Sequence, residues 1–144
     1  MSTTDGLARF GTYRYIVTFD GGSPGNPGRG YGSYRIERVG TDAVVFESVD
    51  FDDGPITNNE AEYLTLIQAL HRLRDNAPES KRRGRGVILV GDSQLVLNQV
   101  SSVWNVNKPE LGMLRNAVWS LTSGFGAVKT EWVPRAEIVK IFGH

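Results

Sequence analysis

The apolar positions of residues 13–20 predict a buried strand. Val17 and Phe19 lie on one face of it and Ile16 lies on the other. A strand that is apolar on both faces is typical of the centre of a sheet. A second short apolar run at residues 87–92 predicts another buried strand.

Three further segments have strand character. Residues 30–39 and 43–51 are strand candidates, and Gly40-Thr41-Asp42 between them is typical of a hairpin turn. Residues 127–133 predict a last strand. The early strands therefore pair as hairpins, whereas the later ones return through helices.

The first apolar residues with helical spacing follow Thr57. Leu66, Leu70 and Leu73 form an apolar stripe in a helix that we expect from Thr57 to about Asp75. Thr57 and Glu60 have the spacing of a capping box, in which each side chain bonds the backbone of the other. Shorter helices are expected over residues 93–100 and from Pro109 onward, where proline suits a first turn.

The resulting order of elements is β-β-β-α-β-α-α-β. It predicts an α/β fold (α+β by some schemes), with a mixed sheet flanked by helices. We expect a polar lead-in over residues 1–12 and one domain over residues 13–144. A chain of 144 residues is long enough for one stable core.

Composition narrows the possible functions. Cysteine is absent, which excludes disulfides and thiolate metal sites and is compatible with an intracellular protein. No apolar run approaches the ~20 residues of a membrane span, and the first residues lack the layout of a signal peptide. The formal net charge is zero, so a polyanion would need a local patch or metal ions. We expect a cytoplasmic monomer without membrane contact.

Three acidic residues occupy places where the chain changes direction. Asp20 ends the first apolar run, Asp92 ends the second, and Glu62 lies in the first turn of the first helix. Such positions collect the chemistry of α/β folds. Carboxylates that converge there can hold divalent ions that act on phosphate. The simpler alternative is that an Asp after a strand is only a turn residue or a helix cap. Glu60 has a structural explanation as a capping residue, whereas Glu62 has no capping role. Attraction of an acid to the positive end of a helix would be a structural explanation for Glu62, but not for Asp20.

Five segments resemble the type 1 ribonuclease H family, in its compact archaeal and bacterial branch with a Val-Pro-Arg segment. They occur in the order of that family and span about residues 13–135. The segments are Phe19 to Gly28, Thr57 to Tyr63, Gly91 to Gln94, Trp104 to Leu111 and Trp132 to Arg135.

The resemblance implies a five-stranded mixed sheet and endonucleolytic cleavage of the RNA strand of an RNA/DNA hybrid. It implies two Mg²⁺ or Mn²⁺ ions, held by Asp20, Glu62 and Asp92 as catalytic carboxylates, with Asp20 bridging. Two such ions about 3.5–4 Å apart can act on both sides of a phosphoryl displacement. The products would carry a 3′-hydroxyl and a 5′-phosphate.

The resemblance also implies a set of substrate-binding residues. Its amides would touch base edges and sugars in the minor groove, where the 2′-hydroxyl marks RNA. Asn26 could instead serve only turn and cap chemistry, and Trp104 could pack in the core. The full set is Gly21, Asn26, Thr57, Asn58, Asn59, Gln94, Trp104 and Arg135.

Basic residues fall into two groups. Arg135, with Arg29, Lys108 and Arg115, is expected to face phosphates. The basic segment at residues 81–85 precedes the strand that ends at Asp92. We expect it to be a solvated loop at the far end of the sheet, because a six-residue strand spans ~20 Å.

The C-terminal segment departs from the family. A fourth carboxylate on a last helix is expected at or near Phe142, so we expect that helix to be missing or altered. Residues 138–142 could extend the last strand or cover an edge of the core. Three carboxylates could suffice, or Glu137, the side chain of His144 or its terminal carboxylate could replace the fourth. Alternatively, the chain is a hybrid-binding module with weak or no cleavage.

Overall fold

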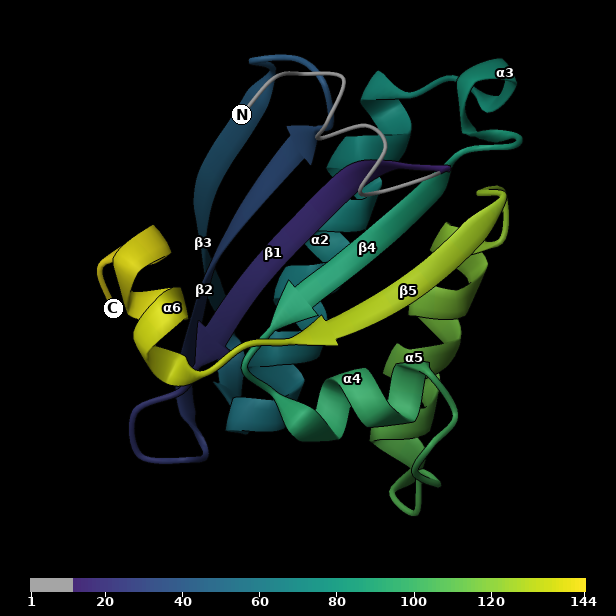
Figure 1. Cartoon of the computed structure of the whole chain (residues 1–144). Coiled ribbons are helices and arrows are strands. Elements are labelled where there is room, and N and C mark those ends of the chain that lie inside the picture. Colours follow the sequence, from purple (N-terminus) through teal and green to yellow (C-terminus); the bar gives the residue numbers. More distant parts are fainter. Residues whose placement is uncertain (1–11) are drawn as a thin grey trace.

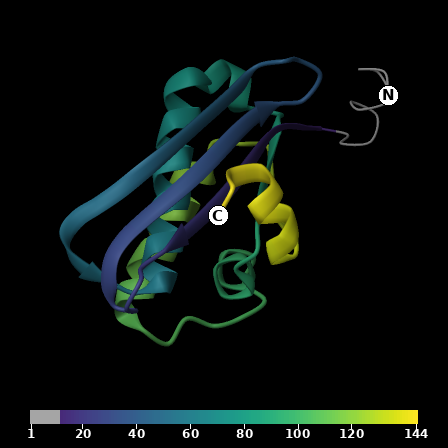
Figure 2. The same ribbon diagram turned by 90° about the vertical axis from the view of Figure 1, so that its left-hand side faces the viewer.

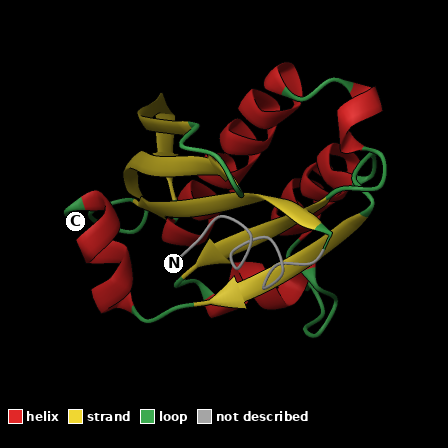
Figure 3. Ribbon diagram, turned by 45° about the horizontal axis from the view of Figure 1, so that its top comes forward, coloured by secondary structure: helices red, strands yellow, loops and turns green. Residues whose placement is uncertain are grey.

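The computed structural model describes residues 12–144, which contain one five-stranded sheet in the order β3-β2-β1-β4-β5 (Figures 1 and 3). β1 pairs antiparallel with β2 and β2 with β3, whereas β4 runs parallel to both β1 and β5. The predicted mixed sheet is confirmed. The strands are β1 (Tyr13–Gly22), β2 (Gly28–Arg38), β3 (Val44–Ile56), β4 (Gly86–Gly91) and β5 (Ala127–Trp132).

The helices cover both faces of the sheet. α2 and α5 pack on one face, and α6 lies on the other (Figures 1 and 2). Within residues 12–144, no helix is both long enough and apolar enough to cross a membrane. The helices are α2 (Asn58–Asn76), α3 (Glu79–Arg82), α4 (Gln94–Val100), α5 (Pro109–Thr122) and α6 (Arg135–Phe142).

The start of α2 has the predicted capping box. The Thr57 hydroxyl accepts from the Glu60 backbone N–H at 3.1 Å, and the Glu60 carboxylate accepts from the Thr57 N–H at 3.0 Å. Loss of such a cap costs about 1 kcal/mol. Glu60 is thus engaged in holding the helix end.

The core lies between the sheet and α2. It includes Phe19 of β1, Leu89 of β4, and Leu66 and Leu70 of α2, all buried. Burying each such side chain contributes roughly 1.5–3 kcal/mol. This packing fixes β1, β4 and α2 relative to one another, and these three elements position the candidate acids.

The last helix is present, so the expectation that it is missing is wrong, and the expectation that it is altered relative to the family stays a prediction. α6 begins directly after Pro134 and is followed by Gly143, whose φ of 80° suits glycine. Ile138 is fully buried, and the ring of Phe142 packs 5.3 Å from that of Phe46 on β3. The segment covers the sheet and does not extend β5. Its apolar residues recur at helical spacing, so a helix can bury them together against the sheet.

The basic segment before β4 lies at the end of the sheet away from α6 and α4, as expected (Figure 1). It is not simply a solvated loop, because α3 runs through it. Arg82 is only 9% exposed, and its Nη1 donates to the Ala77 carbonyl at 2.8 Å. This residue holds the chain between α2 and β4 and is not available to nucleic acid.

Candidate active site

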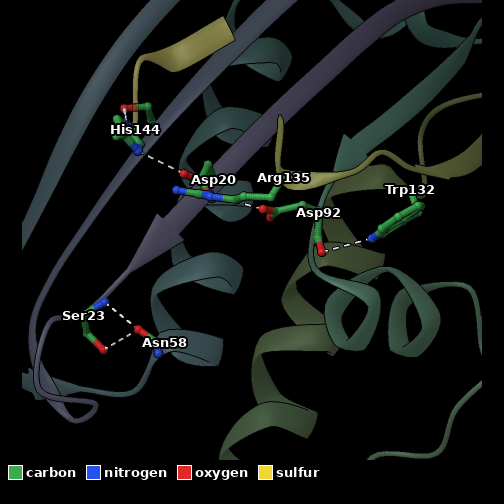
Figure 4. Close-up of polar contacts among 8 residues, drawn as sticks. Asp20, Ser23, Asn58, Asp92, Trp132, Arg135 and His144 are labelled. Carbon is green, nitrogen blue, oxygen red and sulfur yellow. Dashed lines mark hydrogen bonds and ion pairs between the residues drawn. The ribbon is translucent and has the colours of Figure 1, made fainter. Parts of the chain in front are cut away.

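Asp20 and Asp92 lie at the same end of two neighbouring parallel strands (Figure 4). Asp20 lies near the C-terminal end of β1, opposite Ser33 of β2, and is 2% exposed. Asp92 follows the last residue of β4. The carboxyl ends of parallel strands are where open α/β sheets bind ligands.

Arg135 joins the two carboxylates. Its Nη1 donates to Asp20 Oδ1 at 2.8 Å and to Asp92 Oδ2 at 3.2 Å (Figure 4). One guanidinium nitrogen therefore contacts both acids, which places their oxygens near a common point. A positive charge already occupies the space between them.

Glu62 of α2 is the third acid of this cluster. Burial, together with the nearby carboxylates of Asp92 and Asp20, raises its pKa to about 7, although a hydrogen bond from Ser93 and the charge of Arg135 oppose the shift. α2 approaches β1 closely because Gly21 has no side chain: a Cβ there would lie 2.6 Å from the Ala61 carbonyl oxygen. Asp20, Glu62 and Asp92 thus interact electrostatically across three elements.

The raised pKa of Glu62 predicts a pH-dependent stability in metal-free protein. The folded state keeps the proton up to pH about 7, whereas the unfolded state loses it near the ordinary glutamate pKa of 4.5. The free energy of unfolding should therefore fall as pH rises through this window. Between pH 5 and pH 8, the free energy of unfolding of the unmodified chain should fall by roughly 2 kcal/mol more than that of Glu62→Gln. Urea unfolding of both proteins in chelator measures this, and a difference independent of pH would contradict it.

His144 lies on the other side of Asp20 from Arg135 (Figure 4). Its Nδ1 is 3.0 Å from Asp20 Oδ2. Of the substitutes considered for the fourth carboxylate, Glu137 instead pairs with Lys140 at 3.2 Å on the exposed side of α6. Burial raises the pKa of Asp20, and Arg135 and His144 oppose this effect.

The donor set suits a hard divalent ion. Across residues 12–144, no three His, Asp or Glu side chains are arranged closely enough to hold an ion together. Arg135 occupies the space between two of the acids. However, Asp20 Oδ2 is buried without a hydrogen bond. Carboxylate oxygens are the ligands that Mg²⁺ and Mn²⁺ prefer. Asp20, Glu62 and Asp92 therefore fit such an ion once the guanidinium moves.

Two of the expected substrate amides also hold the site together. Asn58 Oδ1 accepts from the Ser23 N–H at 2.8 Å and from its hydroxyl at 3.2 Å (Figure 4). Asn26 Oδ1 accepts from the Asn58 N–H at 2.9 Å. These bonds tie the β1–β2 loop to the start of α2. The cap chemistry considered for Asn26 is thus present, and Gly21 has a packing reason in addition to any substrate role.

The remaining substrate candidates face solvent. Asn59 lines a groove of about 280 Å³ together with Asn26, Thr57 and Lys108. Gln94 is exposed at the start of α4. Trp104 is 45% exposed in the loop before α5, so it is not a core residue. The roles of these side chains and of Arg135 toward substrate stay predictions.

Two supporting serines were missed at the level of sequence. Ser93 caps α4 by accepting from the Val96 N–H at 3.2 Å and bonds Glu62. Its place after Asp92 and before a helix is an N-cap signal that could have identified it. Ser33 bonds His144 Nε2 at 2.8 Å. It carries no local signal, because its closeness to Asp20 depends on the pairing of β1 with β2.

A family model and a known relative each match most of this chain. A family model described as "Reverse transcriptase-like" matches residues 28–140. A "Bifunctional protein Rv2228c" of Mycobacterium tuberculosis is 38% identical over 124 residues, which are 85% of this chain and 32% of that protein. The chain therefore spans about a third of that relative's length.

Two solved structures share the fold. The RNase H1 of Halobacterium salinarum superposes with a TM-score of 0.74 at 34% identity and covers 86% of this chain and 88% of its own. LC11-RNase H1 in complex with an RNA/DNA hybrid gives a TM-score of 0.78 at 25% identity and covers 88% of this chain and 90% of its own.

Proposed function

Because the chain belongs to the type 1 ribonuclease H family, we propose that it is a metal-dependent endonuclease for the RNA strand of RNA/DNA hybrids. One observation carries the proposal: Asp20 and Asp92, at the ends of parallel strands, share one cationic group beside Glu62. Carboxylates gathered in this way are suited to cations that act on phosphate. The solved hybrid complex of a structural relative supports the choice of substrate.

Asp20, Glu62 and Asp92 would hold the divalent ions. Bound ions would neutralise charge on the phosphate and favour deprotonation of the attacking water. Burial of the Asp20 side chain and the hydrogen bond from Ser93 to Glu62 keep two of the acids in place. In hydrolysis, the water oxygen adds to phosphorus and the P–O3′ bond breaks, which leaves a 3′-hydroxyl and a 5′-phosphate.

The residues around the acids would orient the hybrid. In the loaded site, the guanidinium of Arg135 could bond a phosphate, since it forms strong charge-assisted hydrogen bonds. Asn59 and Gln94 carry amides that can both donate and accept, as recognition of a 2′-hydroxyl requires. Lys108 adds positive charge beside Asn59. A chain with a formal net charge of zero depends on such local contacts to hold a polyanion.

Cleavage of a hybrid labelled on either strand tests the proposal. The purified chain with Mg²⁺ or Mn²⁺ should cut the RNA strand and leave the DNA strand intact, and chelator should stop the reaction. RNA cleavage that persists in chelator, or equal cleavage of both strands, would reject it. The monomeric state and the cytoplasmic location stay predictions.

A second candidate function is hybrid binding with weak or no cleavage. It is favoured because α6 directs no carboxylate at Asp20: Glu137, the only acid of this helix, pairs with Lys140 on its exposed side. Anisotropy of a labelled hybrid separates the two functions. Binding without RNA cleavage in both Mg²⁺ and Mn²⁺ would select the binding module.

The position of Arg135 predicts competition with metal ions. An ion on Asp20 and Asp92 must displace the guanidinium, so Arg135→Gln should bind Mn²⁺ more tightly than the unmodified chain. We expect a roughly three- to tenfold lower dissociation constant, because the partly exposed pair is worth ~1 kcal/mol. Lys140→Gln is the matched control, since it removes the same charge from the outer side of α6. Calorimetric titration without substrate measures both, and equal effects would contradict the prediction.

A further inference from the structure

The His144 ring is held against the sheet by its neighbours. Gly143, in the left-handed region, turns the chain after α6. The ring then stacks on Phe142, with centroids 5.9 Å apart and planes 20° apart, and lies edge-on to Tyr31 of β2 at 5.4 Å. Its side chain is 33% exposed. The imidazole is therefore placed by packing, and its two nitrogens have defined surroundings.

Both ring nitrogens face polar atoms of the sheet. Nε2 lies 2.8 Å from Ser33 Oγ, which in turn is 3.2 Å from Ser48 Oγ. Nδ1 lies 3.0 Å from Asp20 Oδ2 (Figure 4). Within the described residues, Nδ1 and Oδ2 are both buried and neither has a hydrogen bond of acceptable geometry. Buried polar atoms in folded proteins nearly always have a partner.

The separation of these two atoms suits a shared ion. Neighbouring ligands of an octahedral ion, each about 2.1 Å from it, lie about 3.0 Å apart. Nδ1 and Oδ2 have this spacing. A hydrogen on Nε2, donated to Ser33, would leave the lone pair of Nδ1 directed at the ion, and such a bond to the far nitrogen is the usual support of a histidine ligand.

We propose that His144 is a metal ligand of this site, with Nδ1 and Asp20 Oδ2 binding one divalent ion together. The inference rests on the proposed function, because it assigns a further ligand to the ions expected there. His144 would supply, from the segment after α6, a donor on the side of Asp20 where that helix presents no carboxylate. Glu137 does not serve, because it bonds Lys140.

The proposal has a consequence for metal selectivity. Imidazole nitrogen favours transition ions such as Mn²⁺ or Co²⁺ over Mg²⁺. His144→Gln should therefore weaken Mn²⁺ binding by roughly tenfold and change Mg²⁺ binding by less than about twofold. His71→Gln is the matched control, since His71 is exposed on α2. It should change neither affinity.

Pulsed electron paramagnetic resonance of the Mn²⁺-loaded chain is the direct test. The chain contains two histidines, so nitrogen modulation of the Mn²⁺ signal has few possible sources. We expect modulation typical of a coordinated imidazole in the unmodified chain and in His71→Gln, and its loss in His144→Gln. Thermal unfolding of each variant in chelator checks that the fold is kept.

The outcomes separate this proposal from the proposed function. If Mn²⁺ binds in an Asp20-dependent way without nitrogen modulation, His144 is not a ligand, while the carboxylate site stands. A signal unchanged in His144→Gln overturns the proposal in the same way. If Asp20→Asn leaves Mn²⁺ binding unchanged, or no Mn²⁺ binds at all, both proposals fail.

Discussion

Asp20→Asn is expected to lower the rate of hybrid cleavage by roughly a thousandfold or more, which is the scale of losing a central charge-stabilising group. Asparagine keeps the size of the side chain and removes the negative charge. Asp20 is the acid that contacts both Arg135 and His144, so its charge is central to the cluster. Single-turnover cleavage of a labelled hybrid in Mn²⁺ measures the effect.

The fold of this variant should be intact. Asp20 is 2% exposed, and burial raises its pKa, so the ionised carboxylate is an unfavourable group in the metal-free protein. The melting temperature of Asp20→Asn in chelator should equal or exceed that of the unmodified chain. Asp52→Asn is the matched control: Asp52 is exposed on β3 and paired with Arg29. Cleavage by Asp20→Asn at the rate of this control would reject the assigned site.

Gly21→Ala should have the second largest effect, on stability and activity together. A Cβ at this position would lie 2.6 Å from the Ala61 carbonyl oxygen and 2.8 Å from the Glu62 nitrogen. Both are backbone atoms, so α2 must move away from β1. We expect a loss of roughly 3 kcal/mol in the free energy of unfolding, at the upper end for overpacking. Cleavage should fall even where the variant is folded, because Asp20 and Glu62 would separate.

Gly112→Ala is the control for Gly21→Ala. Gly112 lies in α5, and the nearest atom to a Cβ there is Val106 Cγ1 at 3.8 Å, an ordinary contact. Alanine in a helix should raise the free energy of unfolding by about 0.5–1 kcal/mol. Urea unfolding of both variants is the measurement. Gly21→Ala with the stability and activity of the unmodified chain would show that close packing of β1 and α2 does not position the acids.

The sequence was informative where structure is set by local rules. Thr57 and Glu60 have the spacing of a capping box, and the structure contains both of its hydrogen bonds. Excluding Glu60 in this way singled out Glu62. Asp20 and Asp92 could be placed together because their strands are both buried, and the carboxyl ends of parallel neighbours meet at one edge.

The same local rules could have identified α6. The expectation of a missing helix followed from departures from a family pattern, but Ile138 and Phe142 are one helical turn apart, with Gly143 as a stop signal. The physical pattern of the segment was the better guide. Its apolar residues pack on β3 through Phe46.

The contacts of Arg135 and His144 could not be derived from the sequence. Arg135 bonds Asp20 across 115 positions of the chain. His144 meets Ser33 across 111 positions. Such contacts depend on how α6 lies on the sheet, which no local pattern determines. Arg82 illustrates the same point, since its burial depends on carbonyl groups at the end of α2 and in the loop after it.

The most direct test of the account is a crystal structure of the chain soaked in Mn²⁺, with the ions located by anomalous scattering. We predict an anomalous peak in coordination contact with Asp20 and movement of the Arg135 guanidinium away from Asp20 and Asp92. At saturating Mn²⁺, a guanidinium still bonded to both carboxylates, with no peak beside Asp20, would contradict the claim that these acids form a metal site.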